Sequence, residues 1–168
     1  PNHIHLIAVP KWKDGLAKSI GEAHRRYTRH INLRENWRGF LWQGRFSSCT
    51  MDEKHVMAAA RYIEMNPVSA GLAVHPGDYR WSSARAHLEG KDDILVNVSP
   101  LLERVKSWKD FLIIRLDDKT RRKLELHERT GKPLGEDPFI RKVEQTLGRA
   151  LHLRAVGRPN KHPEGTRK

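Results

Sequence analysis

Three features are scarce in this 168-residue chain: cysteine, long apolar runs and acidic side chains. The single cysteine, Cys49, excludes an internal disulfide framework and a cysteine-rich zinc site, and it fits a reducing compartment. No stretch approaches the roughly 18 apolar residues that span a bilayer. Nothing resembles a signal peptide or a separate membrane anchor. The sequence therefore argues against a secreted or membrane protein, and we expect a cytoplasmic one.

Basic residues dominate the charge of the chain. It has 32 Lys and Arg against 20 Asp and Glu, a formal net charge of +12 and a sequence pI near 10.2. Such a balance points to a polyanionic partner, and nucleic acid is the first candidate. Residues 119–168 alone carry fourteen Lys and Arg against six Asp and Glu. We interpret this region as a second DNA contact that ends in a disordered tail.

The chain opens with "PNHIHLIAVP", which is typical of a strand closed by a proline. Side chains alternate along a strand, so His3 and His5 share one face and two ring nitrogens can reach one metal ion. The alternative is a surface strand with two hydrated histidines. Because a lone strand cannot satisfy its edge hydrogen bonds, we expect strand partners before residue 1 in the gene.

Hydrophobic periodicity predicts helices through most of the remaining chain. Apolar residues at steps of three and four predict an amphipathic helix over 16–32 with cationic outer faces. A second helix follows the capping-box spacing of Thr50 and Glu53 and is expected to stop before Pro67. Further helical stretches are predicted at about 100–113, 117–129 and 137–150. We expect one domain over 1–95 and a basic helical extension over 96–168.

Tyr62 and Asn66 lie one turn apart on the second helix, so the phenol and the amide oxygen can serve the same point in space. Glu64 is expected to face away from them. If this helix packs beside His3 and His5, two imidazoles and an amide surround a divalent metal with a phenol at its edge. A free phenol attacks poorly until a positive charge or a base favours the phenolate. The alternative is a tyrosine at the edge of the core with a hydrated hydroxyl.

Several motifs occur together in order: "PNHIHLI", "LWQGRF", "RYIEMNPVSAGL", "YRWSS" and "RTGKPLGEDPFIRKVEQTLGRALHLRAVGRPNK". The chain resembles the REP-associated tyrosine transposases, relatives of the IS200/IS605 single-tyrosine transposases in the HUH superfamily. By this resemblance His3 and His5 are the metal-binding HUH pair, Tyr62 is the nucleophile and Asn66 is the third ligand. The resemblance implies a ferredoxin-like α+β fold with a central antiparallel sheet, here without the family's preceding strand, helix and strand.

The resemblance also implies an activity. It predicts cleavage and rejoining of single-stranded DNA near hairpins through a covalent 5′-phosphotyrosine, with Mg²⁺ or Mn²⁺ as cofactor. Such an enzyme acts at the bacterial nucleoid, and the sequence leaves open whether one chain or two form the active unit.

Residues suited to DNA binding gather in the first third of the chain. Arginines can neutralise phosphates, and aromatic rings can stack on unpaired bases. Our predicted contacts are Arg25, Arg26, Arg29, Arg38, Trp42, Gln43 and Arg45. Phe40 and Phe46 are alternatively core residues, and we expect His55 on the surface. Two further readings stay open: a hairpin-binding protein without catalysis, and an RNA-binding module.

Overall fold

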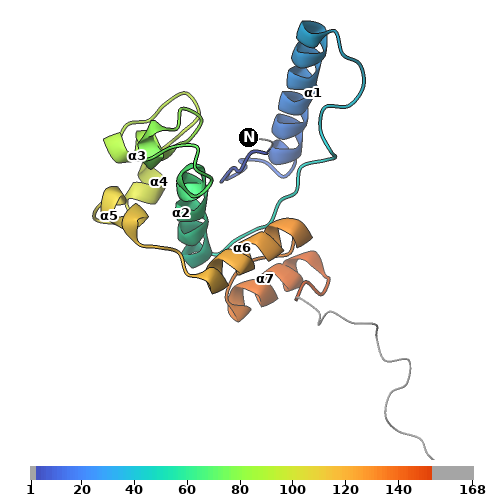
Figure 1. Ribbon diagram of the computed structural model, residues 1–168. Coiled ribbons are helices and arrows are strands. Elements are labelled where there is room, and N and C mark those ends of the chain that lie inside the picture. The colour runs from blue at the N-terminus through green and yellow to red at the C-terminus, as the bar shows by residue number, and fades with distance from the viewer. Residues whose placement is uncertain (1–2, 153–168) are drawn as a thin grey trace, which may run out of the picture.

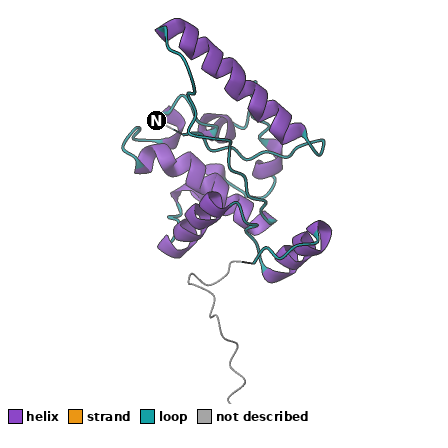
Figure 2. Cartoon of the chain, turned by 90° about the vertical axis from the view of Figure 1, so that its right-hand side faces the viewer, coloured by secondary structure: helices purple, strands orange, loops and turns teal. Residues whose placement is uncertain are grey.

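The computed structural model describes residues 3–152, and these residues form helices joined by loops (Figures 1 and 2). The α-helices are α1 (Gly15–Glu35), α2 (Glu53–Ser69), α3 (Ala84–Glu89), α4 (Ser99–Leu102), α5 (Trp108–Ile113), α6 (Asp118–Thr130) and α7 (Asp137–Leu147), with a short 3-10 turn, η1 (Pro76–Asp78). Figure 1 shows α2 in the middle, with α3 to α5 on one side and α6 and α7 below.

Helix α2 is the centre of packing because its two adjacent alanines face different neighbours. Ala59 joins Leu124 of α6 and Leu134, while Ala60 joins Trp108 and Leu112 of α5. All six residues are at most 6% exposed. Small residues at these positions let α5 and α6 approach the α2 backbone closely. The helix that carries Tyr62 is thus held from both sides.

A buried polar network fixes α2 against α3 and α5. The Glu64 carboxylate is only 1% exposed and accepts hydrogen bonds from Ser83 Oγ at 2.6 Å, His87 Nδ1 at 2.6 Å and Trp108 Nε1 at 2.7 Å. Glu64 does face away from Tyr62, as expected, but into the interior rather than into solvent. A buried carboxylate requires such partners, because an unpaired buried charge is strongly destabilising.

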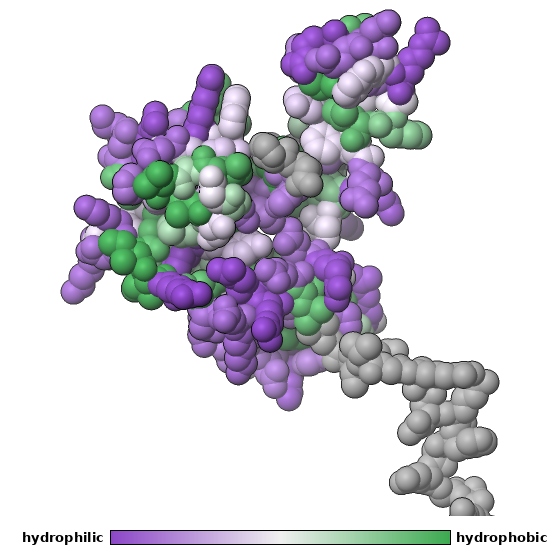
Figure 3. Space-filling model, in the orientation of Figure 1, coloured by the Kyte–Doolittle hydropathy of each residue, from purple (hydrophilic) through white to green (hydrophobic). Residues whose placement is uncertain are grey.

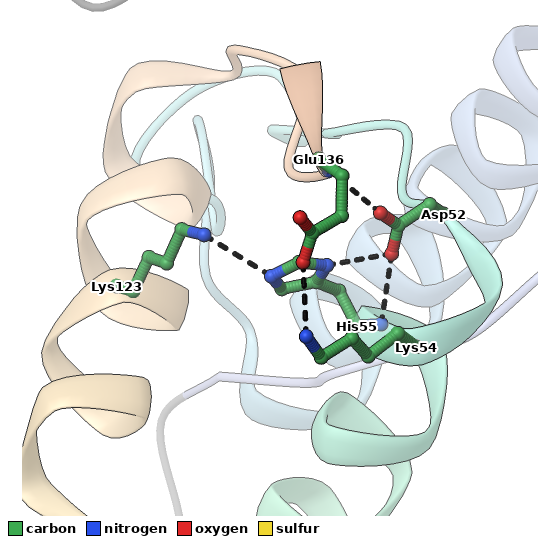
Figure 4. A network of polar contacts seen from close by, with 5 residues as sticks. All are labelled: Asp52, Lys54, His55, Lys123 and Glu136. Carbon is green, nitrogen blue, oxygen red and sulfur yellow. Dashed lines mark hydrogen bonds and ion pairs between the residues drawn. The ribbon is translucent and has the colours of Figure 1, made fainter. Parts of the chain in front are cut away.

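A second network ties the start of α2 to α6 and α7 (Figure 4). Asp52 caps α2 by accepting from the His55 backbone N–H at 2.9 Å, and its other oxygen accepts from the Glu136 N–H at 2.8 Å. The His55 ring lies between Asp52 Oδ1, 2.6 Å away, and Lys123 Nζ, 3.1 Å away. Next to it, Lys54 pairs with the Glu136 side chain at 2.9 Å.

Helix α1 projects away from this body (Figures 1 and 2). Its only buried residue is Ile31, although the helix runs for 21 residues. The loop after α1 turns back along it, and Trp42 stacks on His24 with ring centroids 3.9 Å apart. The Trp42 indole N–H also donates to the His24 carbonyl at 3.3 Å.

The predicted α+β fold is wrong for the described residues: within 3–152 there is no sheet, and the one strand-like pairing is an isolated parallel bridge between Met51 and Leu134. The segment expected to be a strand is an irregular loop whose apolar side chains Ile4, Leu6 and Val9 are exposed. A strand exists only when a partner completes its ladder of hydrogen bonds, and no such partner lies beside this segment among the described residues.

Helix positions agree with the sequence periodicity better than helix ends do. The helix predicted over 16–32 is α1, and those predicted at 117–129 and 137–150 are α6 and α7. The predicted stop before Pro67 is wrong, since α2 continues to Ser69 with Pro67 buried inside it. The capping box is also wrong: the cap is Asp52. The two-domain division stays a prediction, and the expected disordered tail lies outside the described residues.

Among the described residues, no helix combines the length and the apolar character needed to cross a bilayer. Figure 3 shows a largely hydrophilic surface over α6 and α7, with apolar side chains gathered nearer α3 to α5. The hydrophilic surface follows from the composition of α6, in which eight of 13 residues are Lys, Arg, Asp or Glu.

Candidate active site

The two histidines at the start of the chain converge on each other. His3 Nε2 lies 3.0 Å from His5 Nε2, and the rings meet edge to face with centroids 4.7 Å apart. Two nitrogens bound at right angles to one divalent ion, each roughly 2.1 Å from it, would also lie about 3.0 Å apart. The two nitrogens lie at hydrogen-bond distance from each other, and the same spacing would suit a shared cation, although the segment that carries the pair is not a strand.

His5 is half-buried and is oriented by a residue from the far end of the chain. Its Nδ1 lies 3.2 Å from Glu128 Oε1 on α6. Burial lowers the pKa of His5, Glu128 opposes this and raises it, and His3 lowers it further. A metal-binding histidine typically offers one nitrogen to the ion and the other to a carboxylate, which fixes the tautomer and the ring orientation. The Glu128 contact supplies that second partner.

Tyr62 stands directly beside His5, with ring centroids 5.7 Å apart and an interplanar angle of 73°. Burial raises the pKa of Tyr62, and so do the charges of Glu125 and Glu128. Arg121 and a hydrogen bond with the Asn66 side chain act in the opposite direction. The phenol is therefore protonated near neutral pH, and its activation requires additional positive charge.

A pocket of about 530 Å³ opens beside Tyr62, between α2, α5 and α6. Tyr62, Asn66 and Arg61 line it from α2, Arg121 and Glu125 from α6, and Arg115 from the connection between α5 and α6. Its apolar wall includes Leu112 and Leu116. Three arginines against one glutamate make this pocket cationic at the side of the phenol.

The candidate metal site has two converging imidazoles rather than a complete set of ligands. No group of three His, Cys, Asp or Glu side chains that could hold a metal ion occurs within residues 3–152. The predicted third ligand, Asn66, is an amide and bonds the Tyr62 hydroxyl, whose ring contacts His5. The residues fit a divalent ion that takes two protein nitrogens and fills its other positions with water, an amide or substrate oxygens.

None of the seven predicted DNA-binding residues lines the Tyr62 pocket. Arg25 and Arg26 both bond the Glu22 carboxylate at 2.7 Å, and together with Arg29 they border a shallow surface depression on α1. Three more are exposed in the loop after α1, namely Arg38, Gln43 and Arg45. Trp42 packs against α1 instead of standing free, whereas Phe40, an alternative core residue, is fully exposed.

Sequence reasoning missed the contribution of α6. Arg121, Glu125 and Glu128 recur at steps of four and three, so a shared helix face was visible in the sequence. Nothing local reveals that this face meets Tyr62 and His5. The expectation for His55 is wrong, because that ring is only 7% exposed and sits in the Asp52 network. Its i, i+3 spacing from Asp52 was an available signal.

Residues 1–66 match the family model described as "Transposase IS200 like". The matched part is less than half of the chain and contains His3, His5, Tyr62 and Asn66. It supports the resemblance to the IS200/IS605 transposases at the level of a transposase-like, DNA-binding protein. No match to the chain was found among the curated proteins or among the solved structures.

Proposed function

We propose that this chain is a metal-dependent single-tyrosine transposase that cleaves and rejoins single-stranded DNA near hairpins, and that Tyr62 is its nucleophile. The observation that carries the proposal is the contact between Tyr62 and His5, whose Nε2 converges on that of His3. All three residues lie in the part of the chain that matches IS200-like transposases. The net charge of +12 suits a DNA partner in the bacterial nucleoid.

In the proposed reaction the Tyr62 oxygen attacks a backbone phosphorus atom. A bond forms between the phenolic oxygen and phosphorus, the bond from phosphorus to the 3′ oxygen breaks, and that oxygen leaves with a proton as a free 3′-hydroxyl. The phenolic proton passes to water or a base. A bound Mg²⁺ or Mn²⁺ would supply charge that favours the phenolate and polarises the phosphate. The 5′-phosphotyrosine conserves the energy of the phosphodiester, so rejoining follows by reversal with another 3′-hydroxyl.

The protein's own residues would divide the remaining work. His3 and His5 would hold the ion, and Glu128 would fix the His5 tautomer. Asn66 would orient the Tyr62 hydroxyl and serve as the third ligand. The arginines of α1 and of the following loop would bind the strand and hairpin through phosphates, which makes binding sensitive to salt.

The test is formation of a protein–DNA adduct. Labelled hairpin DNA with a single-stranded flank is incubated with the chain and Mg²⁺ or Mn²⁺, and adducts are separated under denaturing conditions. We expect an adduct that a chelator prevents and that Tyr62→Phe abolishes. Tyr27→Phe is the matched control, because Tyr27 is a half-exposed phenol on basic helix α1. An adduct that persists in Tyr62→Phe contradicts the assignment.

A second candidate is a hairpin-binding protein without catalysis. It is favoured by the surroundings of the phenol, since burial and the charges of Glu125 and Glu128 raise the pKa of Tyr62 and oppose its activation. This candidate predicts tight, salt-sensitive hairpin binding that ignores both chelation and Tyr62→Phe. Competition with an RNA hairpin of the same sequence separates DNA recognition from RNA recognition.

A further inference from the structure

The pocket beside Tyr62 contains a guanidinium group whose hydrogen bonding is incomplete. Arg121 Nε is buried and has no hydrogen-bond partner among the described residues. A buried unsatisfied N–H is costly, and native structures rarely keep one without a role. Arg121 lines the same pocket as the Tyr62 phenol, so a ligand in the pocket could meet both groups.

The other two arginines of the pocket, Arg61 and Arg115, differ from Arg121 in their contacts and exposure. Arg61 donates from Nε to the Phe111 carbonyl at 2.9 Å, and its guanidinium lies over the Phe111 ring, 4.1 Å from the centroid. It therefore serves the packing of α2 on α5. Arg115 is exposed at the pocket mouth. Arg115 and Arg121 both line the pocket with Tyr62, so both guanidinium groups are available to an anion there.

We propose that this pocket binds a phosphodiester group of a single-stranded nucleic acid, with Arg121 and Arg115 as the anion ligands and the Tyr62 hydroxyl beside the bound phosphate. The inference rests on the proposed function for the identity of the strand. Arginine suits this role because its planar fork donates two parallel hydrogen bonds to phosphate oxygens. Leu112 and Leu116 form an apolar part of the pocket wall, and a less polar surrounding strengthens such bonds.

The charges around the pocket are consistent with this ligand. The negative charge of Glu125, which lines the pocket from α6 like Arg121, opposes the binding of an anion. The positive charges of the three arginines in the lining favour it. Arg121 and the Tyr62 phenol line this pocket together, so an anion bound by the guanidinium would lie next to the hydroxyl. Arg121, on α6, therefore lies in one pocket with Tyr62, which is 59 positions earlier in the sequence.

Binding is tested apart from chemistry in a Tyr62→Phe background with a chelator present. A fluorescent single-stranded oligonucleotide is titrated at fixed salt. We expect Arg121→Gln to weaken binding about tenfold or more, because charge-assisted bonds to phosphate are lost. Arg122→Gln is the matched control, since Arg122 is an exposed neighbour outside the pocket lining with the same charge. Equal losses in the two variants would mean general electrostatics and overturn the pocket assignment.

A second probe reports on the Arg121 side chain itself. Titration with inorganic phosphate, against chloride at equal ionic strength, should shift the Arg121 Nε–Hε resonance saturably and leave that of Arg122 in place. Arg121→Lys keeps the charge without the fork and should recover part of the oligonucleotide affinity. Circular dichroism melts establish that each variant is folded. An unmoved Arg121 resonance, or equal competition by an acidic peptide of matched charge, sinks the proposal.

The two proposals fail in different ways. If the intact chain forms no adduct, the transposase proposal falls, and the comparison of Arg121 with Arg122 still decides whether the pocket binds phosphate. If the adduct forms and depends on Tyr62, while Arg121→Gln forms it as fast as Arg122→Gln does, the function stands and the Arg121 inference falls. If both proposals are correct, Arg121→Gln should form the adduct about a hundredfold more slowly than Arg122→Gln. An effect of this size is typical when a hydrogen-bond donor to the transition state is lost.

Discussion

The carboxylate of Glu64 accepts a hydrogen bond from the indole of Trp108 at 2.7 Å, deep between α2 and α5. The other oxygen of Glu64 accepts from Ser83 and from His87. Three segments of the chain therefore depend on one acidic side chain for their polar contacts.

Replacement of Glu64 should be among the most damaging single changes in the chain. We expect Glu64→Ala to lower the free energy of unfolding by about 3–5 kcal/mol, because the buried His87 and Trp108 and the partly buried Ser83 lose their shared acceptor. Glu64→Gln should cost about 1–3 kcal/mol, since its amide would face the Trp108 N–H donor to donor. Urea unfolding measures both. The exposed Glu89→Gln serves as control, and an equal change there would contradict this role for Glu64.

Asp52 should control the attachment of α6 and α7. Asp52→Ala removes the cap of α2, the partner of His55 and the acceptor of the Glu136 N–H, so we expect a loss of about 2 kcal/mol. The Glu136 amide should exchange with solvent much faster in hydrogen-exchange measurements. Glu53→Gln removes an exposed ion pair with Arg104 and a charge in the first turn of α2, and it should change stability by less than about 1 kcal/mol. An unaltered exchange rate of the Glu136 amide would argue against this role of Asp52.

The Glu22 carboxylate provides a pH test on α1. Hydrogen bonds from Arg25 and Arg26 lower its pKa to about 2. A lowered carboxyl pKa stabilises the folded form above the ordinary value near 4.5, and this contribution disappears as the pH falls toward 2. A carboxyl carbon titration by NMR should show the low midpoint. In the double variant Arg25→Gln and Arg26→Gln the midpoint should return toward 4.5, and a midpoint that stays near 2 would refute the cause.

The same contacts bear on DNA binding, for which Arg25 and Arg26 are predicted phosphate ligands. In the free protein Glu22 holds both guanidinium groups. We therefore expect Glu22→Gln to raise affinity for single-stranded DNA two- to fivefold at low salt, roughly the worth of an exposed ion pair. Fluorescence anisotropy measures this. Glu35→Gln, which releases Arg34 near the end of α1, is the comparison. Weaker binding by Glu22→Gln would exclude this face as a DNA contact.

Local periodicity predicted the helices, because the spacing of apolar residues is contained in each segment. It could not predict the absence of a sheet from the described residues, since a strand depends on a partner elsewhere. The histidine segment has the right alternation for a strand, yet Ile4, Leu6 and Val9 have no apolar layer to cover them and remain exposed. The alternation of apolar and polar residues predicts which side chains would share a face of a strand. It does not predict whether another segment pairs with that strand or packs against it.

The candidate site was predictable to the extent that its residues lie within one helix. The i, i+4 spacing predicts the partnership of Tyr62 and Asn66, and the two-residue spacing of His3 and His5 indicates a shared metal ion. The motif resemblance assigns a role to each of the four, and these roles stay predictions. Residues that reach the site from a distance were out of range. The helical spacing predicts that Glu64 faces away from Tyr62, but it does not reveal the partners His87 and Trp108, which lie 23 and 44 residues further along the chain.

The contact between His5 and Glu128 has a consequence for protein engineering. A graft of residues 1–66 onto a different scaffold would carry His3, His5 and Tyr62. It would leave behind Glu128, which contacts the His5 ring, and Arg121, which lines the pocket beside Tyr62. Chimaeras between relatives should therefore exchange the opening segment together with α6 as a single cassette. Among natural relatives, the same contact would make the residues at positions 5 and 128 co-vary.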